Sequence, residues 1–167
     1  LTVDGSFTLG AAVAVVMTLS RHPILGLFAA ILAGAAAGFL TAFLQTKMKI
    51  QPILAGIITM TALYSINLMV MDDKANVPIT QQESIYTAFG SLVGKQAQGM
   101  VLSLLVLILA GAAMVLFLKT PFGLSVRATG DNESMVRSSS INADLTKTAG
   151  LMGANACVAL SGAMIAH

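Results

Sequence analysis

Apolar residues fall into five long segments that are separated by polar connections. The segments are residues 7–19, 24–44, 53–71, 100–118 and a fifth that starts near Thr148 and continues to the last residue. A helix needs about 20 apolar residues to cross the roughly 30 Å hydrocarbon core of a membrane. The second, third and fourth segments meet this length, whereas the first is too short. Lipid offers no partner to free backbone groups, so we predict that all five are helices.

The composition agrees with a membrane location. The chain of 167 residues is 56% hydrophobic and 10% charged, whereas a soluble domain carries about 25% charged residues. Its mean hydropathy is +0.86, and its charged residues lie in the connections rather than in the long segments. We therefore predict one all-α, polytopic transmembrane bundle over residues 1–167, surrounded by membrane lipid and incomplete at both ends.

The basic residues indicate how the bundle is oriented. Six of the nine lie in two connections, residues 119–147 and the one that contains Lys47 and Lys49. Both connections fall on the same side if each segment crosses once, and loops rich in Lys and Arg are usually cytoplasmic. We predict that residues 119–147 form a cytoplasmic loop and that residues 72–99 are extracytoplasmic. The small net charge of +2 gives no indication of a nucleic-acid partner.

Small residues recur every fourth position in the second segment, and a similar spacing occurs in the fifth. The positions are Gly26, Ala30, Gly34 and Gly38, followed by Gly150, Ala154, Ser161 and Gly162. This pattern lets membrane helices approach closely. We predict that both segments pack against protein, although Gly and Ala are also simply common in membrane helices.

Polar residues inside apolar segments are the candidates for a transport path, because each costs free energy in lipid. Ser and Thr can bond back to their own helix, so Asn67 and Asn155 are more informative, either as interhelical contacts or as cavity-lining groups. Asp4 precedes the short first segment. It belongs either to a broken helix that lines a substrate path or to a simple N-cap at the membrane edge.

The stretch "RATGDNESMVRSSSIN", Arg127 to Asn142, is strongly polar. We expect Gly130 to interrupt the chain, Asp131 or Asn132 to cap a helix, and Met135 and Val136 to begin its apolar face. This predicts a helix of about two turns after a tight, partly apolar lead-in, "KTPFGLSVRA", with a second helix start after Ile141. The alternative is a solvated linker.

Motifs for catalysis do not occur in the sequence. Neither histidine has Cys, Asp or Glu at metal-ligand spacing, and the chain contains no P-loop, GxSxG or HExxH pattern. The sequence thus gives no support for an enzyme or for a metal site, and the expectation that the chain is not an enzyme is what the family resemblance below implies.

Four blocks of the sequence resemble a known family. They are "LTVDGSFTLGAAVA", "KMKIQPILAGIITMTALYSINLMVM", "TPFGLSVRATGDNESMVRSSSINADLTK" and "GLMGANACVALSGAMIA". Together they resemble the permease subunits of bacterial ABC importers, in the branch of ribose-type and branched-chain amino-acid-type permeases. Within it they are most similar to uncharacterised permeases paired with a substrate-binding lipoprotein, some of whose relatives handle aromatic amino acids. Ser140 departs from the family pattern, which has Gly before Ile-Asn.

The resemblance implies which residues carry function. The third block resembles the cytoplasmic coupling helix, which docks on the ATPase subunit and passes its closure to the membrane helices. It implies contacts with the ATPase at Gly130, Asp131, Asn132, Met135, Val136 and Ile141. The first block resembles a broken helix beside the translocation path. With the two buried asparagines, the candidates for the path are Thr2, Asp4, Ser6, Asn67 and Asn155.

The resemblance also implies the assembly. It predicts an ATP-driven importer of a small solute, with an amino acid of aromatic type suggested, in the bacterial inner membrane. The permease would form a dimer with a second copy, bind two cytoplasmic ATPase subunits and receive substrate from an extracytoplasmic binding protein. ATP and Mg would be bound by the ATPase, with no cofactor in this subunit. The alternative, a secondary transporter or channel, would need ion-coupling carboxylates inside the helices, and Asp4 alone could serve.

Overall fold

The computed structural model describes residues 2–19, 23–71 and 98–166. Within these ranges every regular element is a helix. In chain order they are α1 (Thr2–Leu19), α2 (Pro23–Thr46), α3 (Pro52–Val70), α5 (Gln98–Lys119), α6 (Pro121–Asp131), α7 (Glu133–Ser138) and α8 (Ala143–Ala166). The predicted all-α fold is confirmed. Residues 72–97, most of the predicted extracytoplasmic connection, lie outside the described residues.

Three described helices, α2, α3 and α8, are long and apolar enough to cross a membrane. Helices α5 and α6 meet at a bend of 83° and add a fourth span if the pair is counted as one. The first apolar helix, α1, is shorter, as predicted. Helix α8 begins at Ala143 rather than near Thr148, because the side chain of Asn142 accepts hydrogen bonds from the backbone N–H groups of Asp144 and Leu145.

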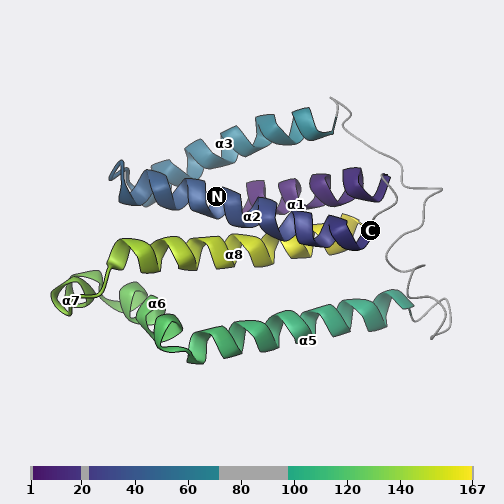
Figure 1. Cartoon of the computed structure of the whole chain (residues 1–167). Helices are drawn as coiled ribbons and strands as arrows, with labels where there is room; N and C mark the ends of the chain where they lie inside the picture. The colour runs from purple at the N-terminus through teal and green to yellow at the C-terminus, as the bar shows by residue number, and fades with distance from the viewer. Residues whose placement is uncertain (1, 20–22, 72–97, 167) are drawn as a thin grey trace.

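The packed part of the bundle is centred on α8, which lies against α1 and α2, while α1 also packs against α3 (Figure 1). Small residues make these contacts: Ala14, Ala30 and Ala163 form a buried cluster where the three helices meet. A methyl group added at Gly10 would lie 2.6 Å from the Cα atom of Ala159, so the backbones of α1 and α8 are in direct contact.

The small-residue pattern of α2 is therefore confirmed as a packing face. Ala30, Gly34 and Gly38 are all buried there. In α8 the prediction is correct at Gly162 but wrong at Ala154 and Ser161, which are exposed. The face that packs is instead formed by Asn155, Ala159, Gly162 and Ala163, because a helix brings positions three and four apart to one side.

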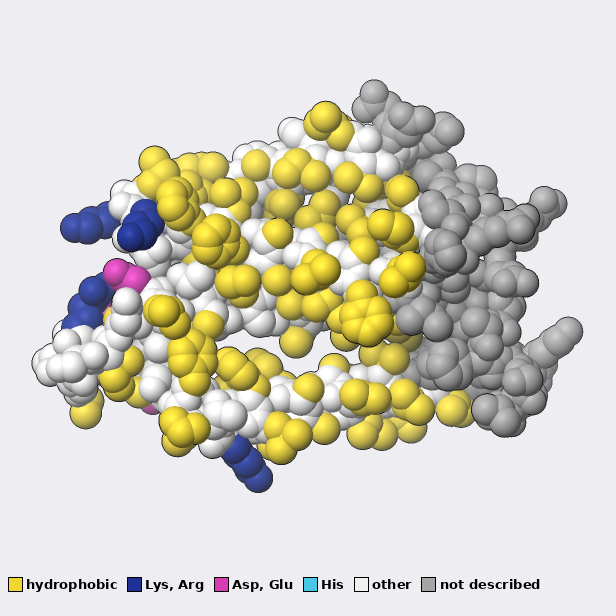
Figure 2. Space-filling view, in the orientation of Figure 1, with side chains coloured by type: hydrophobic (Ala, Val, Ile, Leu, Met, Phe, Trp, Pro, Cys, Tyr) yellow, Lys and Arg dark blue, Asp and Glu magenta, His cyan; other side chains and the backbone are white. Residues whose placement is uncertain are grey.

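Helix α5 lies apart from this packing. Among the described helices its principal contact is α6, and Figure 2 shows the opening that separates it from the rest of the molecule. An almost wholly apolar hollow of about 660 Å³ occupies this opening. Phe28 of α2, Leu109 of α5 and Cys157 of α8 are among the residues that line it.

The first described residues of α1 lie at mid-depth in the bundle (Figure 1). Gly5 faces Met60 and Leu63, which are near the middle of α3, and Asp4 is already helical at this depth. The interpretation of Asp4, Gly5 and Ser6 as a cap at the membrane edge is therefore wrong.

The two basic connections lie at the same end of the bundle, as predicted. The turn between α2 and α3, which contains Lys47 and Lys49, is at the same end as α6 and α7 (Figure 1). The lysine and arginine side chains gather there in the space-filling view (Figure 2). This end carries the candidate functional site.

Candidate functional site

The polar segment, residues 120–147, is built from α6, α7 and the first turn of α8. Helix α6 begins at a cap in which the side-chain oxygen of Thr120 accepts a hydrogen bond from the N–H group of Gly123, 3.1 Å away. Pro121 takes the first helical position, where its fixed backbone angle suits a helix start. The predicted tight lead-in is therefore helical. Gly130 lies within α6 and does not interrupt the chain, so that prediction is wrong.

Asn132 separates α6 from α7. Its backbone is extended, and its side-chain oxygen accepts a hydrogen bond from the N–H group of Met135 at 3.1 Å. Of the two residues predicted as the cap, Asn132 is confirmed, while Asp131 is the last residue of α6. Helix α7 has 6 residues, which is slightly less than two turns of 3.6 residues.

Ser140 forms the turn from α7 into α8 and has a φ of 60°. This left-handed conformation is costly for any residue with a Cβ atom and suits glycine. The position where the sequence departs from the family's Gly is thus the position where the backbone favours Gly. Asn142 then caps α8, which confirms the second helix start predicted after Ile141.

The residues predicted to meet an ATPase divide into two groups. Met135 is 66% exposed and Ile141 is 37% exposed, and the polar members of the set, Gly130, Asp131 and Asn132, are exposed as well. Val136 differs, because it is 4% exposed and its side chain packs inside the chain. The apolar face of α7 therefore has an outer residue, Met135, and an inner residue that anchors the helix.

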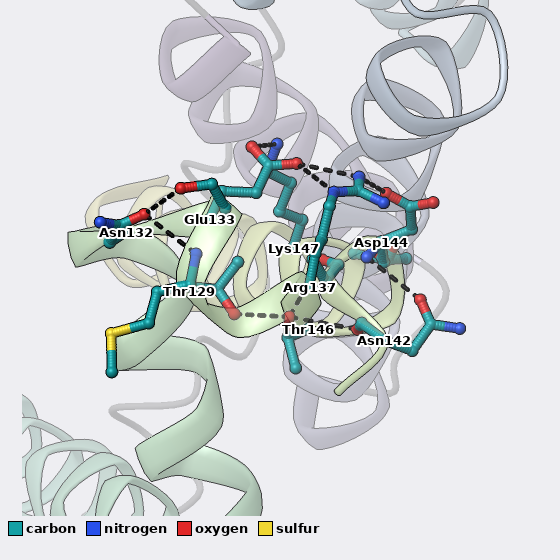
Figure 3. Close-up of polar contacts among 12 residues, drawn as sticks. Thr129, Asn132, Glu133, Arg137, Asn142, Asp144, Thr146 and Lys147 are labelled. Atoms are coloured by element: carbon teal, nitrogen blue, oxygen red, sulfur yellow. Dashed lines mark hydrogen bonds and ion pairs between the residues drawn. The ribbon is translucent and has the colours of Figure 1, made fainter. Parts of the chain in front are cut away.

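Four charged side chains connect α7 to α8, as Figure 3 shows. Glu133 accepts hydrogen bonds from Arg137, at 2.9 Å, and from Lys147 of α8. Arg137 also donates to Asp144 at 2.6 Å. A buried hydrogen bond of 2.8 Å between the hydroxyl groups of Thr129 and Thr146 joins α6 to α8 beside this network.

The network shifts the pKa of two of its members, Glu133 and Arg137. The hydrogen bond from Lys147, followed by the one from Arg137, lowers the pKa of Glu133 from its ordinary value. The hydrogen bond to Glu133, followed by the one to Asp144, raises the pKa of Arg137. Sequence reasoning missed these contacts. The spacing of Glu133 and Arg137, four residues apart on one helix, was the available signal.

The candidates for a path lie around the first half of α1. Ser6, fully buried, donates a hydrogen bond of 2.6 Å to the side-chain oxygen of Asn155. Asn67 of α3 donates to the hydroxyl oxygen of Thr8 at 2.7 Å, and its own side-chain oxygen is buried without a partner among the described residues. Both asparagines therefore join helices, which was one of the two roles considered for them.

Thr2 and Asp4 complete this group of candidates. Thr2 is 9% exposed, and its carbonyl oxygen accepts a hydrogen bond from the hydroxyl group of Ser6. The side chain of Asp4 is exposed on the surface of α1. Within the described residues it forms no ion pair, and no group of three His, Cys, Asp or Glu side chains is placed to hold a metal.

These features define a class, a multi-pass helical membrane protein with a short helical projection at one end. The chain belongs to the family described as "Branched-chain amino acid transport system / permease component", whose model matches residues 1–167. The predicted family resemblance is confirmed. The family and the long apolar helices together place the chain in the inner membrane as a multi-pass protein.

Two curated relatives match the whole chain. A tyrosine transport system permease protein of Clostridioides difficile (strain R20291) is 38% identical over 168 residues, which cover 100% of this chain and 54% of the relative. An uncharacterised protein of Rickettsia prowazekii (strain Madrid E) is 30% identical over 171 residues, covering 100% of this chain and 57% of that protein. The chain thus spans about half the length of these relatives. No solved structure matches it.

Proposed function

We propose that the chain is the membrane-spanning permease part of an ATP-driven importer that moves an amino acid across the bacterial inner membrane. The family match supports a transport role. The observation that carries the coupling to an ATPase is Met135, an apolar side chain 66% exposed on a short helix outside the packed bundle. Isolated exposed apolar groups are common, but this one is held outward by a capped and anchored helix.

The proposal includes the partners. A cytoplasmic ATPase pair binds ATP and Mg and contacts the polar segment. A second copy of the permease completes the pore, and an extracytoplasmic protein delivers the substrate. The relative from C. difficile is a tyrosine transport system permease protein, which supports an aromatic amino acid as the substrate. This division of work leaves the chain without catalysis of its own.

The path is proposed to pass Asp4, at mid-depth beside α1. A carboxylate at this depth is costly in lipid, and that of Asp4 has no ion-pair partner among the described residues. A water-filled path beside it would provide the missing solvation. Thr2, Ser6, Asn67 and Asn155 surround the same part of α1, and the hydrogen bond between Ser6 and Asn155 fixes its position.

Replacing Met135 by Asp tests the coupling contact. We expect Met135→Asp to abolish co-purification of the ATPase with the full-length permease, because a charge at the centre of an apolar contact must be desolvated. Ser134→Asp is the matched control: it adds the same charge one residue away, removes no apolar group and suits the first turn of α7. Retention of the ATPase by Met135→Asp would contradict the proposal.

The orientation is tested with single cysteines in a Cys157→Ala background. We expect Ser84→Cys to react with an impermeant thiol reagent added outside intact cells, and Ser139→Cys to react only after the cells are opened. Labelling of Ser139→Cys in intact cells would reverse the proposed cytoplasmic position of residues 119–147.

A further inference from the structure

Helix α7 is too short to hold its position alone. A helix of 6 residues lies far below the length at which isolated helices are stable in water. Its orientation must therefore come from contacts with other elements. Among the described residues these are its packing against the adjacent helix α6, the buried side chain of Val136 and the ion pairs of Glu133 and Arg137.

The ion pairs lead from α7 to α8. Glu133 contacts Lys147, and Arg137 contacts Asp144, while the bond between Thr129 and Thr146 fixes α6 to the same turn of α8. The connection of the polar segment to α5 is different in kind. It consists of the 83° bend, an edge contact between the rings of Phe117 and Phe122, whose centroids are 6.1 Å apart, and a close approach of Gly123 to the backbone of Phe117 and Leu118 at the end of α5.

Beyond its first turns, α8 continues into the packed part of the bundle. Ala159 lies against the backbones near Gly10 of α1 and Gly34 of α2, and Asn155 is bonded to Ser6. The apolar hollow, by contrast, separates α5 from α2 and α8. A displacement of α7 therefore has a continuous, closely packed route through α8 to α1. Helix α5 is also joined to α6, but among the described helices it has no close packing with α2 or α8 that would carry the displacement further.

We propose that Glu133, Arg137, Asp144 and Lys147 are positioning residues that fix α7 to α8, so that α8 carries ATPase-driven movement of α7 to the part of α1 around Ser6. This inference rests on the proposed function, because it assumes that an ATPase moves α7. Exposed ion pairs contribute little to folding stability, so their replacement leaves the bundle folded. Their effect is on the orientation of one short helix.

The experiment uses the full-length permease in a Cys157→Ala background, with spin labels at Ser138→Cys in α7 and Ser161→Cys in α8. Labelled protein is diluted with unlabelled protein, so that distances within one chain are measured. We expect one narrow distance distribution in the reference protein. Lys147→Met should broaden it and shift its centre, and Lys147→Arg should restore it because the positive charge returns.

A matched control removes a charge outside the network. Arg127 is an exposed basic residue of α6 and forms no ion pair among the described residues. Arg127→Met should leave the distribution narrow. An unchanged distribution in Lys147→Met, or equal broadening in Arg127→Met and Lys147→Met, would contradict the proposal that the ion pairs fix α7 to α8.

The second measurement tests transmission in the complex with its ATPase, with and without nucleotide trapped by vanadate. The distance between the labels on α7 and α8 should stay constant on trapping, whereas a label pair at Ser103→Cys in α5 and Ser161→Cys in α8 should shift. Lys147→Met should reduce this shift, because the nucleotide-dependent change in the equilibrium between the two distances should be about two- to thirty-fold smaller. A change between α7 and α8 in the reference protein would refute the proposal.

The two failures can be told apart. The distance between α7 and α8 is measured on the permease without ATPase, so this result is independent of the proposed function. If the proposed function is wrong, the ATPase will instead be absent from the purified wild-type protein.

Discussion

Helices α5 and α8 are both long and apolar, with 22 and 24 residues, yet they occupy opposite extremes of packing. Large side chains cover α5, and Leu104, Leu107 and Ile108 are each more than half exposed. Helix α8 carries Ala, Gly and Asn on one face, which lies against α1 and α2. Hydropathy predicts that both helices enter the membrane, whereas residue size distinguishes the one that packs within the chain.

The strongest test of this difference in packing is to replace one glycine of the packed bundle and one glycine of α5 by a larger residue. Gly34→Leu should destabilise the bundle by about 3 kcal/mol or more, because even one added carbon would overlap Ala159 and the backbone of α8. Gly111→Leu in α5 should be neutral or slightly stabilising, since nothing lies within 4 Å of that position and Leu favours helices. Thermal unfolding in detergent measures both. Equal losses would show that α5 is packed as tightly as α8.

A smaller effect should come from the polar contact between α1 and α8. Replacing Ser6 and Asn155 by Ala, singly and together, should give a coupling energy of about 0.6–1.7 kcal/mol, as measured for hydrogen bonds between membrane helices. The free energy of unfolding of the four proteins, measured in mixed micelles, gives the coupling energy by a double-mutant cycle. Ser103→Ala in α5 serves as the control and should cost almost nothing. A coupling energy near zero would mean that packing alone joins α1 to α8.

At the turn from α7 into α8, a substitution should stabilise the protein instead of destabilising it. Ser140→Gly should stabilise the protein by about 0.5–1 kcal/mol, because relief of the left-handed strain outweighs the greater freedom of glycine in the unfolded chain. Ser139→Gly, at a φ of −88°, has no such strain to relieve and should be slightly destabilising. The midpoint of thermal unfolding distinguishes them. Stabilisation by both variants would argue against strain at Ser140.

The smallest expected effect is a pH dependence of the network that ties α7 to α8. Lys147 and Arg137 lower the pKa of Glu133 from 4.5, so folding favours the ionised carboxylate. Its contribution is fully present above the ordinary pKa and is lost as the pH falls through the lowered value. We expect the label distance between α7 and α8 to be constant from neutral pH to about 5 and to broaden below about 4.5. Glu133→Gln should remove this dependence.

Much of this architecture could be predicted because lipid enforces simple rules. Apolar length identified α2, α3 and α5, and the apolar run that starts near Thr148 indicated α8. The loop charges placed residues 119–147 and Lys47 at one end. The first residues of the sequence were harder, since Asp4 and Ser6 are polar and yet helical at mid-depth. Gly130 and the preceding stretch were also read wrongly, because the cap of Thr120 and Pro121 outweighs one glycine in an exposed helix.

The sequence located the candidate site, but it did not show which residues of the site are exposed and which are buried. Met135 and Val136 are adjacent and both apolar, and only the packing of the short helix shows that one is exposed and the other buried. The partners of Lys147 were likewise hidden, because Glu133 lies 14 residues away. Contacts between separate helices depend on how those helices cross, and no local spacing encodes that.

Cys157 gives the apolar hollow a chemical reporter. It is the single cysteine of these 167 residues, its side chain is exposed, and it lines the space between α5 and α8. A membrane-soluble thiol reagent that reaches this sulfur will react at a rate that depends on the width of the gap. The rate constant of Cys157 can thus report how far α5 stands from the rest of the bundle.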